Sequence, residues 1–206
     1  MKVVIATRNR GKVQEMNALF ERFLSHIKNY KLLDLTEFPD IPKIEETGST
    51  FYENAKIKAL EVANHTGLLT IGDDSGLEVD VLDNAPGIYS ARFAGKDATD
   101  DSNNNLLLEK LKDFPKESRS AHFVCNLAVA LPDNLIGVFE GVCHGVIGTE
   151  PKGGNGFGYD PLFIRTDLGK SFAELSSDVK NRISHRARAF EKAVVVIERY
   201  IEKTNE

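Results

Sequence analysis

Two long β-rich runs, residues 119–131 and 135–147, constrain the fold of this chain more than any other feature. Pro132, Asp133 and Asn134 lie between them, and turn residues between two strand-like runs predict a hairpin. Because the two strands of a hairpin are antiparallel, a sheet that contains them is not wholly parallel.

Helical and strand-like segments alternate in the rest of the chain. Thr50 and Glu53 have the spacing of a capping box and predict the start of a helix that stops at Gly67. Periodicity predicts further strands at 2–7, 68–72, 77–82 and 162–164, and helices at 13–27, 99–111 and from about 176 onward. Strand–helix units combined with an antiparallel hairpin favour an α/β fold with a mixed sheet, and we expect one domain over residues 1–206.

Composition excludes several functions. The formal net charge of −5 disfavours binding of a nucleic acid polymer, which normally requires a basic face, but a local basic pocket can still bind a small polyanion. No apolar stretch is long enough to cross a bilayer, and residues 1–5 are too short for a secretory signal, so we expect a cytoplasmic protein without a membrane partner. We expect Cys125 and Cys143 to be packing residues and not a disulfide.

Two adjacent carboxylates form the most informative local motif. Asp73 and Asp74 lie between Gly72 and Gly76, directly after the apolar run 68–71. Oxygen ligands at the end of a strand suit Mg²⁺ and the phosphates that it binds. Asp, Ser and Gly are also the usual residues of a turn, and taken alone the motif favours a simple turn between two strands.

Three further segments could bind an anionic ligand. Residues 7–12 could hold phosphate at the start of a helix, although they lack the Walker A spacing and are also typical of a basic helix-opening loop. The glycine-rich segment 153–158 places Phe157 and Tyr159 where they could stack on a base or pack in the core. Five basic residues near the start of the last helix suggest an anionic ligand or a solvated face: Lys180, Arg182, His185, Arg186 and Arg188.

Taken together, these segments resemble the inosine triphosphate pyrophosphatase family, which hydrolyses deaminated purine nucleoside triphosphates. The resemblance covers nearly the whole chain, although residues 97–150 contribute little to it. The matching segments, in chain order, are Thr7-Arg8-Asn9-Arg10-Gly11-Lys12, Glu45-Glu46-Thr47-Gly48, Asp73-Asp74-Ser75-Gly76-Leu77, Ala85-Pro86-Gly87-Ile88-Tyr89-Ser90-Ala91-Arg92, Gly156-Phe157-Gly158-Tyr159-Asp160-Pro161 and Ser184-His185-Arg186.

The resemblance implies an activity and a set of site residues. The reaction would be Mg²⁺-dependent hydrolysis of ITP, dITP or XTP to the monophosphate and pyrophosphate. Asp74 would be the general base and a metal ligand, and Glu46 would complete the metal site. The residues that would bind the phosphates are Thr7, Arg8, Asn9, Arg10, Gly11, Lys12 and Ser75. Those of the nucleotide pocket would be Phe157, Gly158, Tyr159, Asp160, Lys180, His185 and Arg186.

The resemblance also implies an elongated mixed β-sheet with flanking helices, two lobes around a central cleft, and assembly as a homodimer. Three alternatives remain open at this point. One is a pyrophosphatase of related fold for pyrimidine or modified nucleotides. Another is a nucleotide-binding module without catalysis. The third is a nucleic-acid-binding protein that uses the basic last helix, which conflicts with the acidic net charge.

Overall fold

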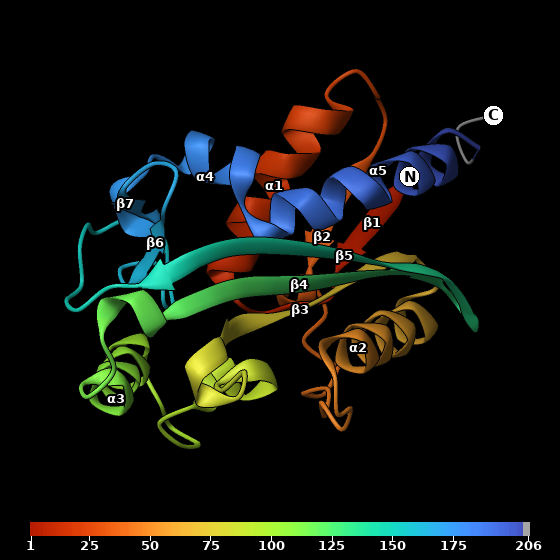
Figure 1. Ribbon diagram of the computed structural model, residues 1–206. Helices are drawn as coiled ribbons and strands as arrows, with labels where there is room; N and C mark the ends of the chain where they lie inside the picture. Colours follow the sequence, from red (N-terminus) through yellow and green to blue (C-terminus); the bar gives the residue numbers. More distant parts are fainter. Residues whose placement is uncertain (204–206) are drawn as a thin grey trace. The chain divides into compact units, whose positions relative to one another are not determined.

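The computed structural model describes residues 1–203, which form two compact units (Figure 1). Unit 1 contains residues 1–74, 125–141 and the chain from Arg186 onward, and unit 2 contains residues 75–124 and 142–185. This division agrees with the two lobes that the resemblance implies. The single domain over residues 1–206 and the cleft stay predictions.

The strands form a seven-stranded mixed sheet in the order β2-β1-β3-β4-β5-β6-β7, which confirms the predicted fold class. β1 is parallel to β2 and β3, whereas β6 is antiparallel to β5 and β7. The strands are β1 (Lys2–Ile5), β2 (Lys31–Asp34), β3 (Leu69–Val79), β4 (Ser120–Leu131), β5 (Asn134–Ile147), β6 (Phe163–Arg165) and β7 (Lys170–Ser171). The helices are α1 (Arg10–Leu24), α2 (Phe51–Thr66), α3 (Asp100–Leu111), α4 (Ser177–Ile183) and α5 (His185–Lys203).

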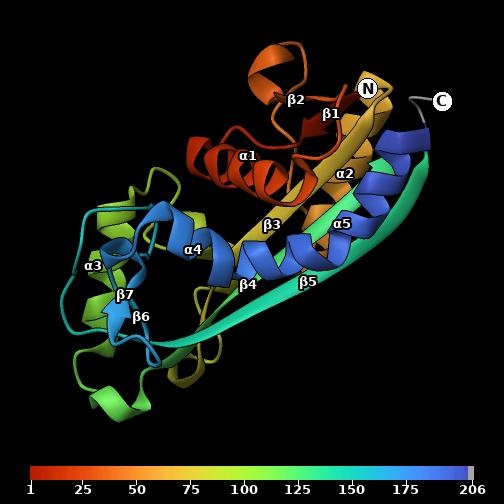
Figure 2. The same ribbon diagram turned by 90° about the horizontal axis from the view of Figure 1, so that it is seen from above.

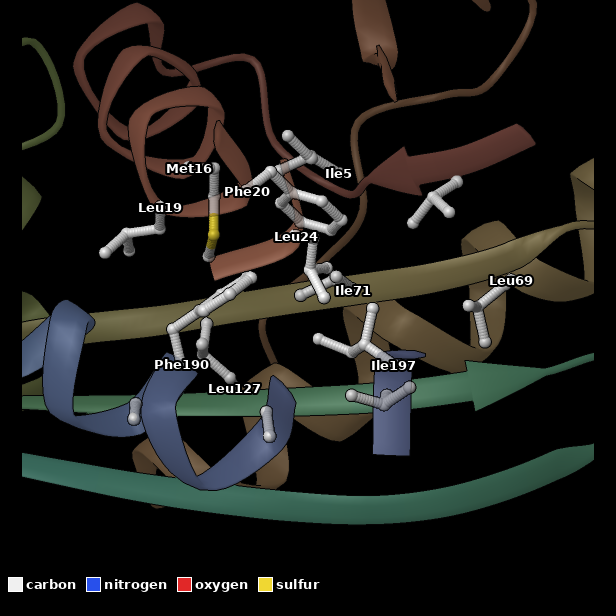
Figure 3. Close-up of a cluster of buried hydrophobic side chains, with 14 of the residues drawn as sticks. Ile5, Met16, Leu19, Phe20, Leu24, Leu69, Ile71, Leu127, Phe190 and Ile197 are labelled. Carbon is white, nitrogen blue, oxygen red and sulfur yellow. The ribbon is translucent and has the colours of Figure 1, made fainter. Parts of the chain in front are cut away.

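Within unit 1, helices cover both faces of the strands. α1 and α5 lie side by side over one face, where Phe20 packs edge-on against Phe190 with ring centroids 5.0 Å apart (Figures 2 and 3). α2 covers the other face, and its alanines pack on Ala128 and Ala130 of β4 (Figure 1). Gly72 permits this close packing, because a Cβ there would lie 2.3 Å from the backbone oxygen of Ala55.

Unit 2 has its own core, with Leu77, Leu107 and Phe163 among its buried members. Arg119 is buried beside it and donates hydrogen bonds to three backbone oxygens, those of Leu111, Phe114 and Gly148, at 2.7, 3.1 and 3.2 Å. The guanidinium therefore links the end of α3 and the segment after it to the residue that follows β5.

The local predictions are confirmed at most helix ends and at the hairpin. Thr50 accepts a hydrogen bond from the Glu53 N–H at the start of α2, and Gly67 ends that helix at φ 70°. The Glu53 carboxylate also accepts a hydrogen bond from the backbone N–H of Ser49 at 2.6 Å. Pro132 and Asp133 join the neighbouring strands β4 and β5. Both cysteines are buried and free, as expected.

Two predicted boundaries are wrong. The acidic motif is not a turn between strands 68–72 and 77–82, because β3 continues through it from Leu69 to Val79. Side-chain ion pairs satisfy both carboxylates, so the backbone has no need to turn towards water. The last helix is also not continuous, since Ser184 is extended at ψ 162° and separates α4 from α5. Sequence patterns did not predict β2 or β7, which are short.

Candidate functional site

The loop between β1 and α1 is held by its own side chains. The Thr7 hydroxyl accepts a hydrogen bond from the Asn9 N–H at 3.2 Å, and the Asn9 side chain caps α1 by accepting from the Lys12 N–H at 3.0 Å. The Arg8 guanidinium donates to the Ile41 carbonyl at 2.6 Å, which ties the loop to a neighbouring segment. Arg10 and Gly11 lie in the first helical turn, which contains no acidic residue. The turn thus keeps the positive electrostatic character of a helix N-terminus.

Asp73 anchors this loop to the interior of unit 1. Its side chain is 0% exposed and contacts Lys12 Nζ at 2.6 Å and Arg186 Nε at 2.6 Å. Arg186 also donates to Glu15 of α1 and is itself fully buried. Burial alone would raise the pKa of the Asp73 carboxyl, but the charges of Arg186 and Lys12 outweigh it and hold the pKa well below its usual range. Asp73 is therefore an ionised, buried structural residue at neutral pH.

Asp74 is next in the strand and has a different set of partners. Lys58 of α2 lies between Asp74 and Glu46, with its ammonium nitrogen 2.6 Å from Asp74 Oδ1 and 2.9 Å from Glu46 Oε1. Burial raises the pKa of the Asp74 carboxyl, and the charges of Lys58 and Lys12 offset this only in part. Two consecutive carboxylates thus have pKa values shifted in opposite directions, an arrangement that separates a structural acid from a candidate proton acceptor.

The chemistry of this donor set fits a magnesium ion. Asp74 and Glu46 contact the same ammonium group, so their oxygens already surround one position suited to a cation. Within residues 1–203 no group of three or more His, Cys, Asp or Glu side chains could hold a metal ion. Two carboxylates with the remaining ligands supplied by water and phosphate are the usual protein site for Mg²⁺.

In unit 2, the glycine-rich segment forms a second cluster around Asp160. Its buried carboxylate pairs with Lys180 of α4 and accepts a hydrogen bond from the Phe157 N–H at 2.9 Å. The Lys180 ammonium also lies 4.8 Å from the centre of the Phe157 ring. Gly156 has a φ of 78°, and a Cβ there would lie 2.0 Å from Asp160 Oδ2. Glycine is therefore required for Asp160 to lie beneath the loop.

Neighbouring elements hold the rest of this segment. Gly158 is bound at both polar backbone atoms, since its N–H donates to Asp100 at 2.7 Å and its carbonyl accepts from the Asn104 amide at 3.0 Å. The Tyr159 hydroxyl donates to the Ser90 carbonyl at 2.8 Å, and burial raises its pKa. The segment from Phe157 to Asp160 is consequently fixed before any ligand binds.

The remaining predicted site residues lie as follows. His185 is buried and stacks on Phe123, with ring centroids 4.7 Å apart and planes inclined by 15°. Ser75 is a half-buried residue of β3. Arg186 lies between Asp73 and Glu15, so the predicted contact of Arg186 with a purine stays a prediction.

Several residues of these clusters were not identified from the sequence: Glu15, Lys58, Asp100 and Asn104. Lys58 had a detectable signal, because helical spacing places it on the same face as Ala55 and Val62, which pack in the core. A lysine on the buried face of a helix indicates a buried acidic partner or a ligand. Asp100 and Asn104 had no such signal, since Asp and Asn are ordinary at the start of a helix.

Comparison with known sequences identifies the same family over nearly the whole chain. The model of the Ham1 family matches residues 3–196. A protein from Exiguobacterium sibiricum named dITP/XTP pyrophosphatase is 50% identical over 192 residues, which are 93% of this chain and 94% of that protein. A protein of the same name from Desulforamulus reducens is 47% identical over 199 residues, covering 97% and 96% of the two chains.

Solved structures agree with the sequences. A Ham1 protein from Coxiella burnetii matches with a TM-score of 0.85 and 42% identity, over 97% of this chain and 99% of that one. The Staphylococcus aureus Ham1 protein matches with a TM-score of 0.82 and 39% identity, over 96% and 98%. These matches confirm the family resemblance inferred from the sequence motifs. The chain belongs to the Ham1 family.

Proposed function

We propose that this protein hydrolyses the noncanonical purine nucleoside triphosphates ITP, dITP and XTP to the monophosphate and pyrophosphate, using Mg²⁺. The observation that supports this most directly is the pair of carboxylates, Asp74 and Glu46, on one buried ammonium group. The relatives of this protein that are named dITP/XTP pyrophosphatase support the proposed substrate class. The activity would remove deaminated purines from the nucleotide pool.

Asp74 is the proposed general base. It accepts a proton from the water that attacks the α-phosphorus, while the bond from that phosphorus to the pyrophosphate oxygen breaks. A base with a pKa nearer to neutral holds the proton better during the attack, so the raised pKa of Asp74 suits this role. Bound Mg²⁺, held by Asp74 and Glu46, supplies neutralisation of phosphate charge and activation of water.

Positive groups of unit 1 are the proposed phosphate ligands. The first turn of α1, with Asn9 as its cap, presents backbone N–H groups that suit an anion. Lys12 and Lys58 are the nearby side-chain cations, already in contact with Asp73 and Asp74. Positioning and charge neutralisation of this kind provide most of the catalysis in phosphoryl transfer.

The Asp160 cluster of unit 2 is the proposed base-binding element. Phe157 offers an aromatic surface to a purine. The N–H groups of Phe157 and Gly158 already donate to Asp160 and Asp100, so other donors, from His185 or from nearby backbone N–H groups, would pair with the C6 oxygen of hypoxanthine or xanthine. Adenine has an amino group at C6 and would leave such donors unpaired, which can discriminate by roughly 10⁴-fold. That the Asp160 cluster and the pair of Asp74 and Glu46 bind the same substrate molecule stays a prediction.

The decisive experiment is a magnesium-dependent assay of ITP, XTP, dITP, ATP, GTP, UTP and dTTP that distinguishes pyrophosphate from orthophosphate. We expect pyrophosphate, with kcat/KM highest for ITP, XTP and dITP. Preference for a pyrimidine, or release of orthophosphate, would refute the proposal. No turnover of any nucleotide despite tight binding would indicate a binding module.

We further propose that the protein works in the cytoplasm as a homodimer. No helix within residues 1–203 is both long and apolar enough to cross a membrane. Sedimentation of the purified protein tests the dimer, and a mass of one chain at micromolar concentration would reject it.

A further inference from the structure

Lys58 takes up the place between the two carboxylates that the proposed function assigns to a divalent ion. Its ammonium nitrogen lies 2.6 Å from Asp74 Oδ1 and 2.9 Å from Glu46 Oε1. The side chains of Lys58 and Asp74 are only 10% and 9% exposed, so water screens their interaction weakly. Both of these carboxylate oxygens would also be candidate ligands of a metal.

The loop that carries Glu46 is held firmly and cannot easily make room. The Gly48 N–H donates to the Asn54 side chain at 2.8 Å, and a Cβ on Gly48 would lie 2.7 Å from the same oxygen atom. Asp74 is fixed within β3. Lys58, by contrast, has a flexible four-carbon stem. The backbone positions of Glu46 and Asp74 are thus held, whereas the side chain of Lys58, like that of the 30% exposed Glu46, can change its rotamer.

We propose that Lys58 is an internal counter-ion that competes with Mg²⁺ for Glu46 and Asp74 in the nucleotide-free protein. This inference rests on the proposed function. When a nucleotide brings the metal and its negatively charged phosphates together, the Lys58 ammonium transfers from the carboxylates to phosphate oxygens. Metal and substrate therefore bind together, and the free protein has little affinity for the metal alone.

Charge balance supports this exchange. Two carboxylates and one ammonium leave one excess negative charge at this position. A divalent ion added beside the ammonium would repel it strongly, because like charges a few ångströms apart interact by several kcal/mol even at an effective dielectric constant of about 20. The triphosphate supplies enough negative charge to hold both cations.

The test measures metal binding in the absence of nucleotide. Mn²⁺ binding by electron paramagnetic resonance and Mg²⁺ binding by calorimetry are compared in wild type, Lys58→Met and Lys58→Arg. We expect Lys58→Met to bind metal at least about tenfold more tightly than wild type, whereas Lys58→Arg keeps the positive charge and binds weakly. The matched control is Lys56→Met, the same change at an exposed position of α2, which should leave the affinity unchanged.

Further variants keep the result interpretable. Asp74→Asn added to Lys58→Met should abolish the gain, which locates the metal at Asp74. If Lys58→Met does not fold, Lys58→Gln tests the same loss of charge with a polar side chain. Wild-type affinity equal to or tighter than that of a folded neutral variant overturns the inference. The proposed function fails separately, if wild type releases no pyrophosphate from ITP with Mg²⁺.

Discussion

Asp73→Asn and Asp74→Asn make the same chemical change at consecutive residues, but the first should reduce stability and the second should reduce activity. Asp73 is 0% exposed and binds two cations, so its loss leaves the buried Arg186 guanidinium poorly compensated. Asp74 forms an ion pair with Lys58, and in Asp74→Asn the Lys58 ammonium still has its ion pair with Glu46. We therefore expect Asp73→Asn to lower the free energy of unfolding, and Asp74→Asn to abolish pyrophosphate release with little loss of stability.

The size of the effect follows from the contacts. Removing one member of a buried ion pair costs about 3–5 kcal/mol, and because Glu15 still binds Arg186 we expect about 3 kcal/mol for Asp73→Asn. For a chain of this length that lowers Tm by about 6–12 °C. Asp74→Asn should cost under about 1 kcal/mol, because burial already disfavours the ionised form of Asp74 and raises its pKa.

Urea unfolding at pH 7 provides the measurement, with circular dichroism to confirm the fold. The pH dependence gives a second check, because the pKa of Asp73 is lowered in the folded state. Its stabilisation is complete above the unfolded pKa of about 3.9 and is lost as the pH falls below it, so the difference between wild type and Asp73→Asn should narrow in acid. Equal stability of the two variants at pH 7 would refute this division of roles.

Three other predictions concern single features. In the pH profile of kcat/KM for ITP, the acidic limb should lie above the ordinary pKa of an aspartate, because burial raises the pKa of Asp74; a limb at or below that ordinary pKa contradicts the base assignment. Gly156→Ala should cost about 1–3 kcal/mol and raise KM for ITP, since it displaces Asp160; an unchanged KM would separate this loop from the substrate. Arg119→Met should lower stability by about 3 kcal/mol in urea unfolding but leave KM unchanged, because the carbonyls of Phe114 and Gly148 lose the Arg119 donor and that of Leu111 keeps only the Phe114 N–H.

The fold was predictable where local chemistry and long-range packing agree. Pro132 and Asp133 favour a turn in any context, and Thr50 and Gly67 mark the ends of α2 through bonds within a few residues. The Ham1 motifs identified the family because several short segments match in the same order. Strand β2 was missed because its four residues show no periodicity that distinguishes them from a loop.

The failures occur where distant partners decide the outcome. Asp73 and Asp74 have the composition of a turn, and only Arg186, Lys12 and Lys58, which are far away in the sequence, make an uninterrupted strand possible there. The apolar pattern likewise continues from Ile183 to Ala187 and hides the break at Ser184. Residue types at the candidate site were predictable, but the partner of each charge was not.

The uninterrupted path of β3 limits how this site can be altered or transplanted. Successive side chains of a strand point to opposite sides, so Asp73 contacts residues of α1 and α5 while Asp74 contacts α2. Deletion of one residue just before Asp73 would place Asp74 at the anchoring position and Ser75 at the reactive one. Insertion of one residue would place Asp73 at the reactive position and the inserted residue at the anchoring one. Surface loops tolerate changes in length, but in β3 the number of residues around Asp73 and Asp74 must be preserved as strictly as their identity.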